Sequence, residues 1–355
     1  MPQTHGVLSD LHGICRTDSY PAGPADGRRE QGNRSPLGAK STGKEITMTI
    51  NKAAVIGAGA VGGYLISSLS AKLGENLYVV AKGERGERLQ RDGLTINGIR
   101  YDLNVKAPEE ARDADVLFVT LKYQALEKAL PDIEALVGEH TAVVSLMNGI
   151  DSEEIIGGRI GMEHMIYSLV RISSTRKGNS MEFEIPSGYN GIYLGMPGKK
   201  PLEDERIAAI AELFKDTPIN LHLSDDILFD IWEKFALNIS RNLPQAVIDV
   251  GAGAYDDSVY LKDVENKLRD EVVKIAAAKG IKLLPNNKVG AYTPSQKYST
   301  LQDILAGRKT EIDMFCGALM KMGRELGIPT PYSEFIFDFI KCLEEKAEGK
   351  FDYKV

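Results

Sequence analysis

The sequence predicts an α/β protein that joins an N-terminal Rossmann-type dinucleotide-binding domain to a C-terminal all-helical domain. A glycine-rich turn lies between an apolar run and an amphipathic run at residues 54–73. From residue 52 onward apolar strands alternate with helical stretches, an order typical of parallel βαβ units. From about residue 201 nearly every segment has helical periodicity. We therefore expect three regions, which are a tail over 1–47, the dinucleotide-binding domain over 48–218 and the helical domain over 219–355.

The composition is that of a globular protein. The chain has 355 residues, of which 43% are hydrophobic and 26% are charged, enough for two domains with sizeable cores. The net charge of −7 argues against a nucleic-acid partner, and no apolar run approaches the ~20 residues that span a membrane. Three scattered cysteines without a C-x-x-C pair indicate a reducing, cytoplasmic location. Five scattered histidines show no metal-ligand spacing, so we expect no metal site.

Residues 1–47 differ in composition from the rest of the chain. They are rich in Gly, Pro, Ser, Arg and Asp and show no sustained apolar period, which predicts a disordered tail. They lack the continuous apolar core of a secretory signal, and their acidic residues disfavour a transit peptide. Because Met48 stands just before the first strand, we expect the folded protein to begin there. The role of the tail and the native start stay open.

The first glycine-rich turn has dinucleotide-binding spacing. Gly57, Gly59 and Gly62 form G-x-G-x-x-G between a strand at 53–57 and a helix at 60–73. The first glycine permits the tight turn, the second lets a pyrophosphate approach the backbone, and the third lets the helix pack closely on the strand. The helix N-terminus then offers free N–H groups to the phosphates. The predicted cofactor-binding residues here are Gly57, Ala58, Gly59, Ala60, Val61 and Gly62.

The remaining elements follow from apolar runs and turn signals. Further strands are expected at 77–81, 116–120 and 142–146, and helices at 84–92 and about 123–136. Residues 165–196 contain alternating segments and two turn signals, which predict antiparallel strands that complete the sheet. We place the domain junction near Pro218. Helices are expected after about residue 201, at 203–215, 225–246, 256–279, 299–326 and 332–347.

The end of the second strand indicates the type of dinucleotide. NAD sites usually place an Asp or Glu there for the ribose hydroxyls, whereas this chain has Lys82. A cation suits the 2′-phosphate of NADP(H); the alternative is an ordinary solvated loop charge. Lys122 follows the strand at 116–120, at the carboxyl edge where open α/β sheets bind ligands, and could reach the same phosphates.

A second polar pattern lies on the helix that begins near Asp226. Lys234, Asn238 and Asn242 fall at i, i+4 and i+8, which places a cation and two amides on one helical face. Asparagine is a mediocre helix former, so two of them in register with a lysine beside an apolar stripe indicate a polar pocket. The alternative is a row of solvated polar residues.

From Lys52 to the C-terminus the chain resembles the ketopantoate reductase (2-dehydropantoate 2-reductase) family. The likeness rests on five blocks in order, the last of which is the most specific: 57–62, 119–122, 147–149, 232–242, and 299–304 followed by 307–313. The resemblance implies NADPH-dependent reduction of the 2-keto group of ketopantoate to pantoate, a step toward coenzyme A. It also makes 48–218 the NADP-binding domain and 219–355 the substrate and catalytic domain.

The resemblance also implies roles for individual residues. Lys234 would be the general acid that protonates the developing alkoxide. Glu311 would bind the substrate hydroxyl and help hold Lys234, and Asn148 would lie where cofactor and substrate meet. Asp303 would support the pocket rim. The residues that would hydrogen-bond the substrate are Asn238, Asn242 and Ser299.

Other interpretations stay open for several of these residues. By position alone Glu311 would be a solvated helix charge and Ser299 a helix N-cap. Met147 replaces the Gln common before Asn-Gly, and the stretch 171–195 is unusually charged, which leaves the exact 2-keto acid undecided. Alternative functions are reduction of another 2-keto acid, a β-hydroxyacid dehydrogenase, or a non-catalytic NADPH-binding regulator. The oligomeric state is also open, with a homodimer as the candidate.

Overall fold

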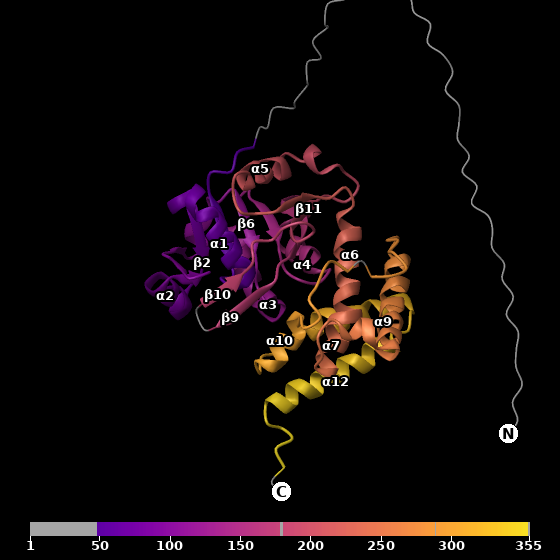
Figure 1. Cartoon of the computed structure of the whole chain (residues 1–355). Helices are drawn as coiled ribbons and strands as arrows, with labels where there is room; N and C mark the ends of the chain where they lie inside the picture. The colour runs from indigo at the N-terminus through magenta and orange to yellow at the C-terminus, as the bar shows by residue number, and fades with distance from the viewer. Residues whose placement is uncertain (1–47, 178–179, 288, 354–355) are drawn as a thin grey trace, which may run out of the picture. The chain divides into compact units, whose positions relative to one another are not determined.

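The computed structural model describes residues 48–177, 180–287 and 289–353. The predicted tail at 1–47 therefore lies outside the described residues. Residues 53–224 of the described part form a sheet-containing Rossmann-type part, and the residues after them form a helical part (Figure 1). The two-domain α/β architecture expected from the sequence is confirmed.

An eight-stranded sheet organises the Rossmann-type part. Its strands lie in the order β12-β11-β8-β7-β6-β1-β2-β5. From β8 to β5 neighbouring strands run parallel, whereas β11 is antiparallel to β8 and parallel to β12. The strand bounds are β1 (Ala53–Ile56), β2 (Leu77–Val80), β5 (Asn104–Lys106), β6 (Val116–Val119), β7 (Ala142–Ser145), β8 (Met165–Arg171), β11 (Gly191–Gly195) and β12 (Leu221–Leu223).

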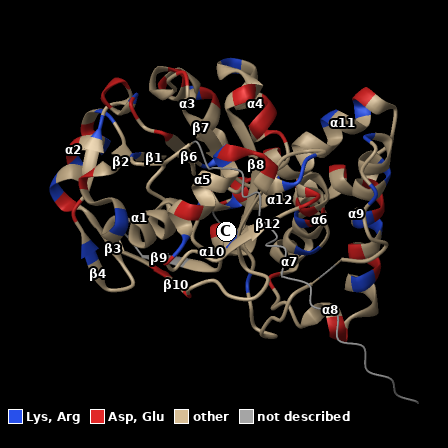
Figure 2. Ribbon diagram, turned by 90° about the horizontal axis from the view of Figure 1, so that it is seen from above, with Lys and Arg blue, Asp and Glu red and all other residues tan. Residues whose placement is uncertain are grey.

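Helices cover both faces of this sheet. Since strand side chains alternate between faces, Val55 packs in one core with α1 (Ala60–Leu73) and α5 (Glu205–Phe214), whereas its neighbour Ile56 packs in another with α3 (Tyr123–Leu136) and α4 (Ser152–Ile160). Figure 2 shows α1 on one side of the strands and α3 and α4 on the other. Burial on both faces explains the continuous apolar run at β6.

The strands after residue 171 correct one prediction. Only β8, β11 and β12 extend the main sheet; β9 (Ser174–Lys177) and β10 (Ser180–Phe183) join β3 (Leu94–Ile96) and β4 (Ile99–Tyr101) in a separate four-stranded sheet. Met181 of β10 is buried there against Ile66 and Ile96, beside α2 (Gly83–Asp92). The hairpin thus buries its apolar side against α1 and not at the edge of the main sheet.

Among the described residues after β12 there are only helices and loops. A core that includes Trp232, Phe235, Leu268 and Phe315 holds the helices together. The helices are α6 (Ile227–Leu237), α7 (Leu243–Ile248), α8 (Ala254–Asp257), α9 (Val259–Ala278), α10 (Ser299–Leu305), α11 (Ala318–Leu326) and α12 (Pro331–Ala347). Two π turns interrupt them, the first at Asn238–Asn242 and the second at Asp313–Gly317.

Three predicted boundaries need correction. The helix expected at 225–246 widens into the first π turn, so its hydrogen-bond spacing changes after Leu237. The helix expected at 299–326 ends at Leu305, two residues before Gly307 with its φ of 62°, and regular α-helix resumes only at 318. The sheet continues past the junction expected near Pro218, because β12 pairs with β11. The helical part therefore begins with α6.

No helix within 48–177, 180–287 or 289–353 is both long enough and apolar enough to cross a membrane. The same residues contain no group of three or more His, Cys, Asp or Glu side chains that could hold a metal ion. Acidic and basic residues alternate along the ribbon in Figure 2.

Candidate active site

The predicted site residues of the Rossmann-type part lie at one edge of the sheet. The loop with Gly57 follows β1, Lys122 follows β6, and Asn148 follows β7. Because β1, β6, β7 and β8 run parallel, their carboxyl ends meet at this edge. Ligands of open α/β sheets bind outside this edge.

The three motif glycines are required for different reasons. Gly57 has a φ of 106°, and a Cβ there would lie 2.7 Å from the carbonyl oxygen of Thr120. A Cβ on Gly62 would lie 2.0 Å from the carbonyl oxygen of Gly57. A Cβ on Gly59 would meet nothing within 4 Å. The fold therefore needs Gly57 and Gly62, whereas Gly59 keeps the space beside the start of α1 clear.

The rest of the loop offers backbone to a ligand. Gly59 is the N-cap of α1 and has no side-chain capping bond, so the first-turn N–H groups at Ala60 and Val61 have no capping side chain. Ala58 is buried in the core, with 5% of its surface exposed, and can contribute only its main chain. An uncapped helix start beside open space fits a pyrophosphate.

Both predicted phosphate-binding lysines are ion-paired. Lys82, at the end of β2, pairs with Asp132 of α3, and its side chain is 66% exposed. Lys122 Nζ lies 3.0 Å from Asp303 Oδ2, and Arg308 Nε lies 2.8 Å from the other oxygen of that carboxylate. Lys122 thus links the Rossmann-type part to α10. The contact of either lysine with a phosphate stays a prediction.

Lys234, Asn148 and Glu311 form one hydrogen-bonded chain. Lys234 Nζ donates to Asn148 Oδ1 at 2.7 Å, and Asn148 Nδ2 donates to Glu311 Oε2 at 3.0 Å. Lys234 lies on α6, Asn148 after β7, and Glu311 just before the second π turn. Gly149 has a φ of 96°, and a Cβ there would lie 2.8 Å from Met314 Cγ, so the Asn148 loop packs tightly beside the Glu311 segment. The fold thus brings together Asn148 and Glu311, which are 163 residues apart in the sequence.

The surroundings make Lys234 a weak base. Burial, and secondly the positive charge of Arg171, lower the pKa of Lys234 from 10.5 to about 7, against the opposing charges of Glu311 and Glu153. Burial also raises the pKa of Glu153 to about 7. A group with a pKa near neutrality can donate a proton and be recharged at physiological pH. Lys234 therefore has the electrostatics of a general acid.

The predicted substrate-binding residues divide into two kinds. Asn238 is partly buried, and its side-chain amide makes no hydrogen bond with the described residues. Asn242 is buried; its Nδ2 donates to Ser299 Oγ at 3.0 Å and its Oδ1 accepts from Thr300 N at 3.1 Å. Asn242 thus caps α10. Ser299 is the first residue of that helix, whose N-cap is Tyr298.

The first π turn lies between these two asparagines. The predicted row at i, i+4 and i+8 assumed a regular α-helix through Asn242, but the turn over Asn238–Asn242 has i→i+5 spacing. Because a π turn rotates less per residue than an α-helix, it keeps Asn242 close to the helical face of Lys234 and Asn238, and their shared role in substrate binding stays a prediction.

Two family models match this chain. The model described as "Ketopantoate reductase PanE/ApbA" matches residues 53–196, and the model of its C-terminal domain matches residues 226–344. Together they cover most of the chain. The chain belongs to the ketopantoate reductase family.

Individual family members resemble the chain over nearly their whole length. A 2-dehydropantoate 2-reductase of Archaeoglobus fulgidus is 28% identical over 305 residues, 84% of this chain and 99% of the relative. A solved ketopantoate reductase of this family from Ralstonia eutropha has a TM-score of 0.70 at 22% identity, covering 84% of this chain and 99% of that one. A dimeric ketopantoate reductase from Staphylococcus aureus has a TM-score of 0.65 at 20% identity, with coverage of 83% and 99%. The two structures support the same fold.

One charged residue near the Lys234 cluster, Arg171, was not predicted from the sequence. Arg171 is the last residue of β8, at the same sheet edge as Asn148, and its Nη1 donates to Tyr189 Oη at 2.8 Å. The available signal was a basic residue that opens the charged stretch 171–195, within the segment 165–196 where strands were expected.

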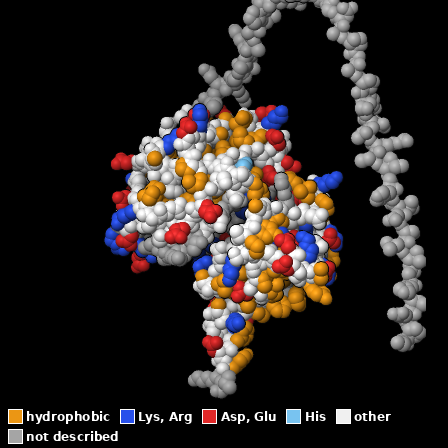
Figure 3. Space-filling view, viewed as in Figure 1, with side chains coloured by type: hydrophobic (Ala, Val, Ile, Leu, Met, Phe, Trp, Pro, Cys, Tyr) orange, Lys and Arg blue, Asp and Glu red, His pale blue; other side chains and the backbone are white. Residues whose placement is uncertain are grey.

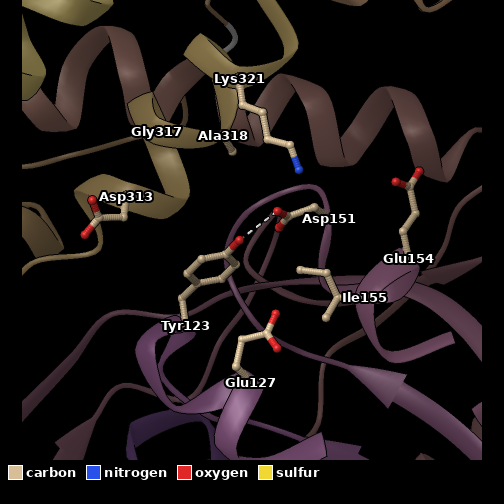
Figure 4. Close-up of a pocket in the computed structure, with 9 residues that line it drawn as sticks. All are labelled: Tyr123, Glu127, Asp151, Glu154, Ile155, Asp313, Gly317, Ala318 and Lys321. Atoms are coloured by element: carbon tan, nitrogen blue, oxygen red, sulfur yellow. Dashed lines mark hydrogen bonds between the residues drawn. The ribbon is translucent and has the colours of Figure 1, made fainter. Parts of the chain in front are cut away.

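A separate cavity of about 500 Å³ lies between α3, α4 and the segment from the second π turn into α11 (Figure 4). Tyr123 Oη donates to Asp151 Oδ2 at 2.8 Å across it, and Lys321 extends over it. Burial raises the pKa of Asp151. The predicted site residues do not line this cavity, so it is distinct from the Lys234 cluster.

Proposed function

We propose that this protein reduces 2-dehydropantoate to pantoate with NADPH and that Lys234 is its general acid. The observation that carries the proposal is the chain from Lys234 through Asn148 to Glu311, which holds an amine of pKa about 7 at the carboxyl edge of a Rossmann-type sheet. The 2-dehydropantoate 2-reductase of Archaeoglobus fulgidus, which matches 84% of this chain, supports the same substrate.

The residues present fit a dinucleotide. Gly59 leaves open space beside the uncapped start of α1, which would hold the pyrophosphate, and Lys82 would approach the 2′-phosphate. When bound, NADPH supplies the hydride. Side chains of this protein would supply the proton and position the substrate.

Lys234 would complete the reduction at the oxygen of the substrate. As the hydride pair forms the new C–H bond at the keto carbon, the C=O π pair moves to the oxygen. The Lys234 ammonium gives its proton to that oxygen and becomes the neutral amine, which a depressed pKa favours.

Neighbouring amides would fix the positions. Asn148 holds the Lys234 amine through its Oδ1, so the proton points in a defined direction. Glu311, 7% exposed, accepts from Asn148 through Oε2 and keeps Oε1 for a substrate hydroxyl. Asn238, one turn after Lys234, has an amide available for the substrate. Asn242 and Ser299 would act by holding α10.

Oxidation of NADPH by purified protein tests the proposal. We expect turnover with 2-dehydropantoate that exceeds turnover with pyruvate, 2-ketoisovalerate and phenylglyoxylate. A clear preference for one of the others would mean that the protein is a reductase of another 2-keto acid. Turnover with none of them, although NADPH binds, would support a non-catalytic NADPH-binding protein.

We also infer that the protein is a homodimer, which was one candidate from the sequence, and that it is cytoplasmic. The S. aureus relative is described as dimeric. Hydrophobic side chains gather over α12 in Figure 3, where Phe335 is 62% exposed and Phe339 is 43% exposed. Light scattering coupled to size exclusion measures the mass directly; a monomeric mass at working concentrations would overturn this inference.

A further inference from the structure

Arg171 lies beside the Lys234 cluster on a neighbouring element. It ends β8, which pairs in parallel with β7, and β7 leads to Asn148. Helix α6, which carries Lys234, packs on β8 through a core cluster formed by Leu169, Ile227 and Ile231. Arg171 is therefore at the sheet edge where Lys234 and Asn148 meet.

Aromatic rings hold the guanidinium in place. The guanidinium carbon of Arg171 lies 4.7 Å from the centroid of the Tyr189 ring and 5.9 Å from that of Tyr193. Tyr193 Oη donates to the carbonyl oxygen of Tyr189 at 2.7 Å, which fixes the two rings relative to each other. A Cβ on Gly290 of the helical part would lie 2.8 Å from the Tyr189 ring. A glycine of the helical part thus packs against the ring that lies beside the Arg171 guanidinium.

The charge of Arg171 has no acidic partner. No Asp or Glu of the described chain forms an ion pair with it, and its Nε is buried without a hydrogen-bond partner. The buried Arg269, in contrast, meets the Glu233 carboxylate at 2.9 Å. The positive charge of Arg171 acts on Lys234, whose pKa it lowers, so the two cations lie close enough to repel each other. Glu311 and Glu153 act on Lys234 through their charge, but neither Arg171 nor Lys234 forms an ion pair with a carboxylate of the described residues. Two such cations near each other favour binding of an anionic ligand.

We propose that Arg171 binds the carboxylate of the 2-keto acid and makes the protein select substrates with a free carboxylate group. This assignment rests on the proposed function and names the residue that recognises one end of that substrate. In a 2-keto acid the carboxylate and the keto oxygen are on adjacent carbons. A residue for the carboxylate must therefore be a close neighbour of the residue that protonates the oxygen, as Arg171 is of Lys234. The planar guanidinium matches a carboxylate in shape and charge.

The test compares Arg171→Gln with the unmodified protein on a 2-keto acid and on its neutral carboxamide. We expect Arg171→Gln to raise KM for the acid at least roughly tenfold and to reduce the preference for acid over amide, with NADPH affinity unchanged. The alkaline limb of kcat/KM should also move to higher pH, because loss of the positive charge raises the pKa of Lys234. Arg159→Gln, which breaks an exposed pair with Glu134, is the matched control.

A binding measurement separates this inference from the proposed function. Oxamate is a non-reacting carboxylate analogue, and its affinity for the NADPH complex can be measured by calorimetry even if no keto acid is turned over. Weaker oxamate binding by Arg171→Gln, but not by Tyr189→Phe, which keeps the ring, would support the assignment. Equal oxamate affinity in all three proteins, or an undiminished acid-over-amide preference in Arg171→Gln, would overturn it.

Discussion

Burial disfavours the charged form of Lys234 but gives its amine a pKa suited to proton transfer. Desolvation and the nearby Arg171 disfavour its charged form, and its amine is held by Asn148. The same burial that lowers the stability of the ammonium brings its pKa close to neutral pH, where a general acid is most effective. Sites of this kind commonly exchange some stability for activity.

Stability measurements over pH should therefore detect Lys234 without any substrate. The pKa of Lys234 is about 7 in the folded protein and 10.5 in an ordinary environment, so the unfolded state binds more protons between these values. The contribution of Lys234 to the free energy of unfolding thus rises with pH across that window. Lys234→Met should stabilise the protein most below pH of about 7, and this advantage should shrink toward pH of about 10 in urea titrations.

The control is Lys274→Met, which removes an exposed lysine paired with Asp270 on α9. A difference between Lys234→Met and the unmodified protein that is the same at every pH would contradict a depressed pKa.

Lys82 should decide the cofactor preference. We expect NADPH to be preferred over NADH by at least roughly tenfold in kcat/KM, and Lys82→Asp to reduce or reverse this ratio, because the carboxylate would repel the 2′-phosphate. Asp132→Asn provides a second variant. It removes the ion-pair partner of Lys82, so the preference for NADPH should persist or grow. Equal use of both cofactors by the unmodified protein would show that Lys82 is only a surface charge.

At the scale of elements, irregular helix segments adjoin the site. The first π turn begins four residues after Lys234, and the second begins two residues after Glu311. π turns are rare in proteins overall, and many of those that occur lie at functional sites. In the first π turn, the i→i+4 hydrogen-bond spacing of α6 changes to i→i+5, and Asn242 at its end hydrogen-bonds the start of α10. Hydrophobic periodicity cannot distinguish i→i+4 from i→i+5 hydrogen bonds, so the sequence could not predict this change.

The elements that were predicted well share a physical cause. Strands β1, β6 and β7 are buried on both faces, which requires the unbroken apolar runs that the sequence displays. The hairpin of β9 and β10 has only one buried side. Its alternation of apolar and polar residues would be the same in the eight-stranded sheet and in the four-stranded sheet. The contact that decides its place, Met181 against Ile66, joins residues far apart in the chain.

The glycine turn gives a matched pair of substitutions. Gly59→Ala adds a methyl group into open space at a φ of −91°, so we expect an unchanged Tm but NADPH binding at least roughly tenfold weaker. Gly62→Ala forces a methyl group to within 2.0 Å of the Gly57 carbonyl oxygen, so we expect a lower Tm as well. Thermal unfolding and NADPH titration measure the two effects. If Gly59→Ala binds NADPH as tightly as the unmodified protein does, the Gly57–Gly62 loop is not part of the cofactor site.

At the scale of the whole molecule, the site needs both parts of the chain. Asn148 comes from the Rossmann-type part, whereas Lys234 and Glu311 come from the helical part. Lys122 and Gln124 connect the same parts, through Asp303 and the carbonyl oxygen of Thr310. Motif positions and the family resemblance predicted that Lys234, Asn148 and Glu311 act together. The position of Asp303 between Lys122 and Arg308, and the effect of Arg171 on the pKa of Lys234, depend on how the two parts pack. Spacing along the sequence does not encode this packing.

The bridge at Asp303 should matter for substrate binding. This carboxylate is 7% exposed and contacts both Lys122 and Arg308. We expect Asp303→Ala to raise KM for the keto acid several-fold with little change in NADPH affinity, since a partly exposed ion pair contributes about 1 kcal/mol. Asp263→Ala, which breaks the exposed pair with Lys267 on α9, is the control. Identical KM values for the two variants would show that the bridge does not position the site.

The most direct test of Lys234 as the proton donor is the turnover of Lys234→Ala with 2-dehydropantoate and NADPH, measured by the loss of NADPH absorbance. If Lys234 donates the proton, kcat should fall by at least about 100-fold while NADPH affinity changes little, because the cofactor is assigned to the Gly57–Gly62 loop and Lys82. We expect the unmodified protein to lose activity above pH of about 7 as Lys234 deprotonates, and the residual activity of Lys234→Ala should lack this alkaline limb. A folded Lys234→Ala protein that turns over at a near-normal rate would contradict the mechanism.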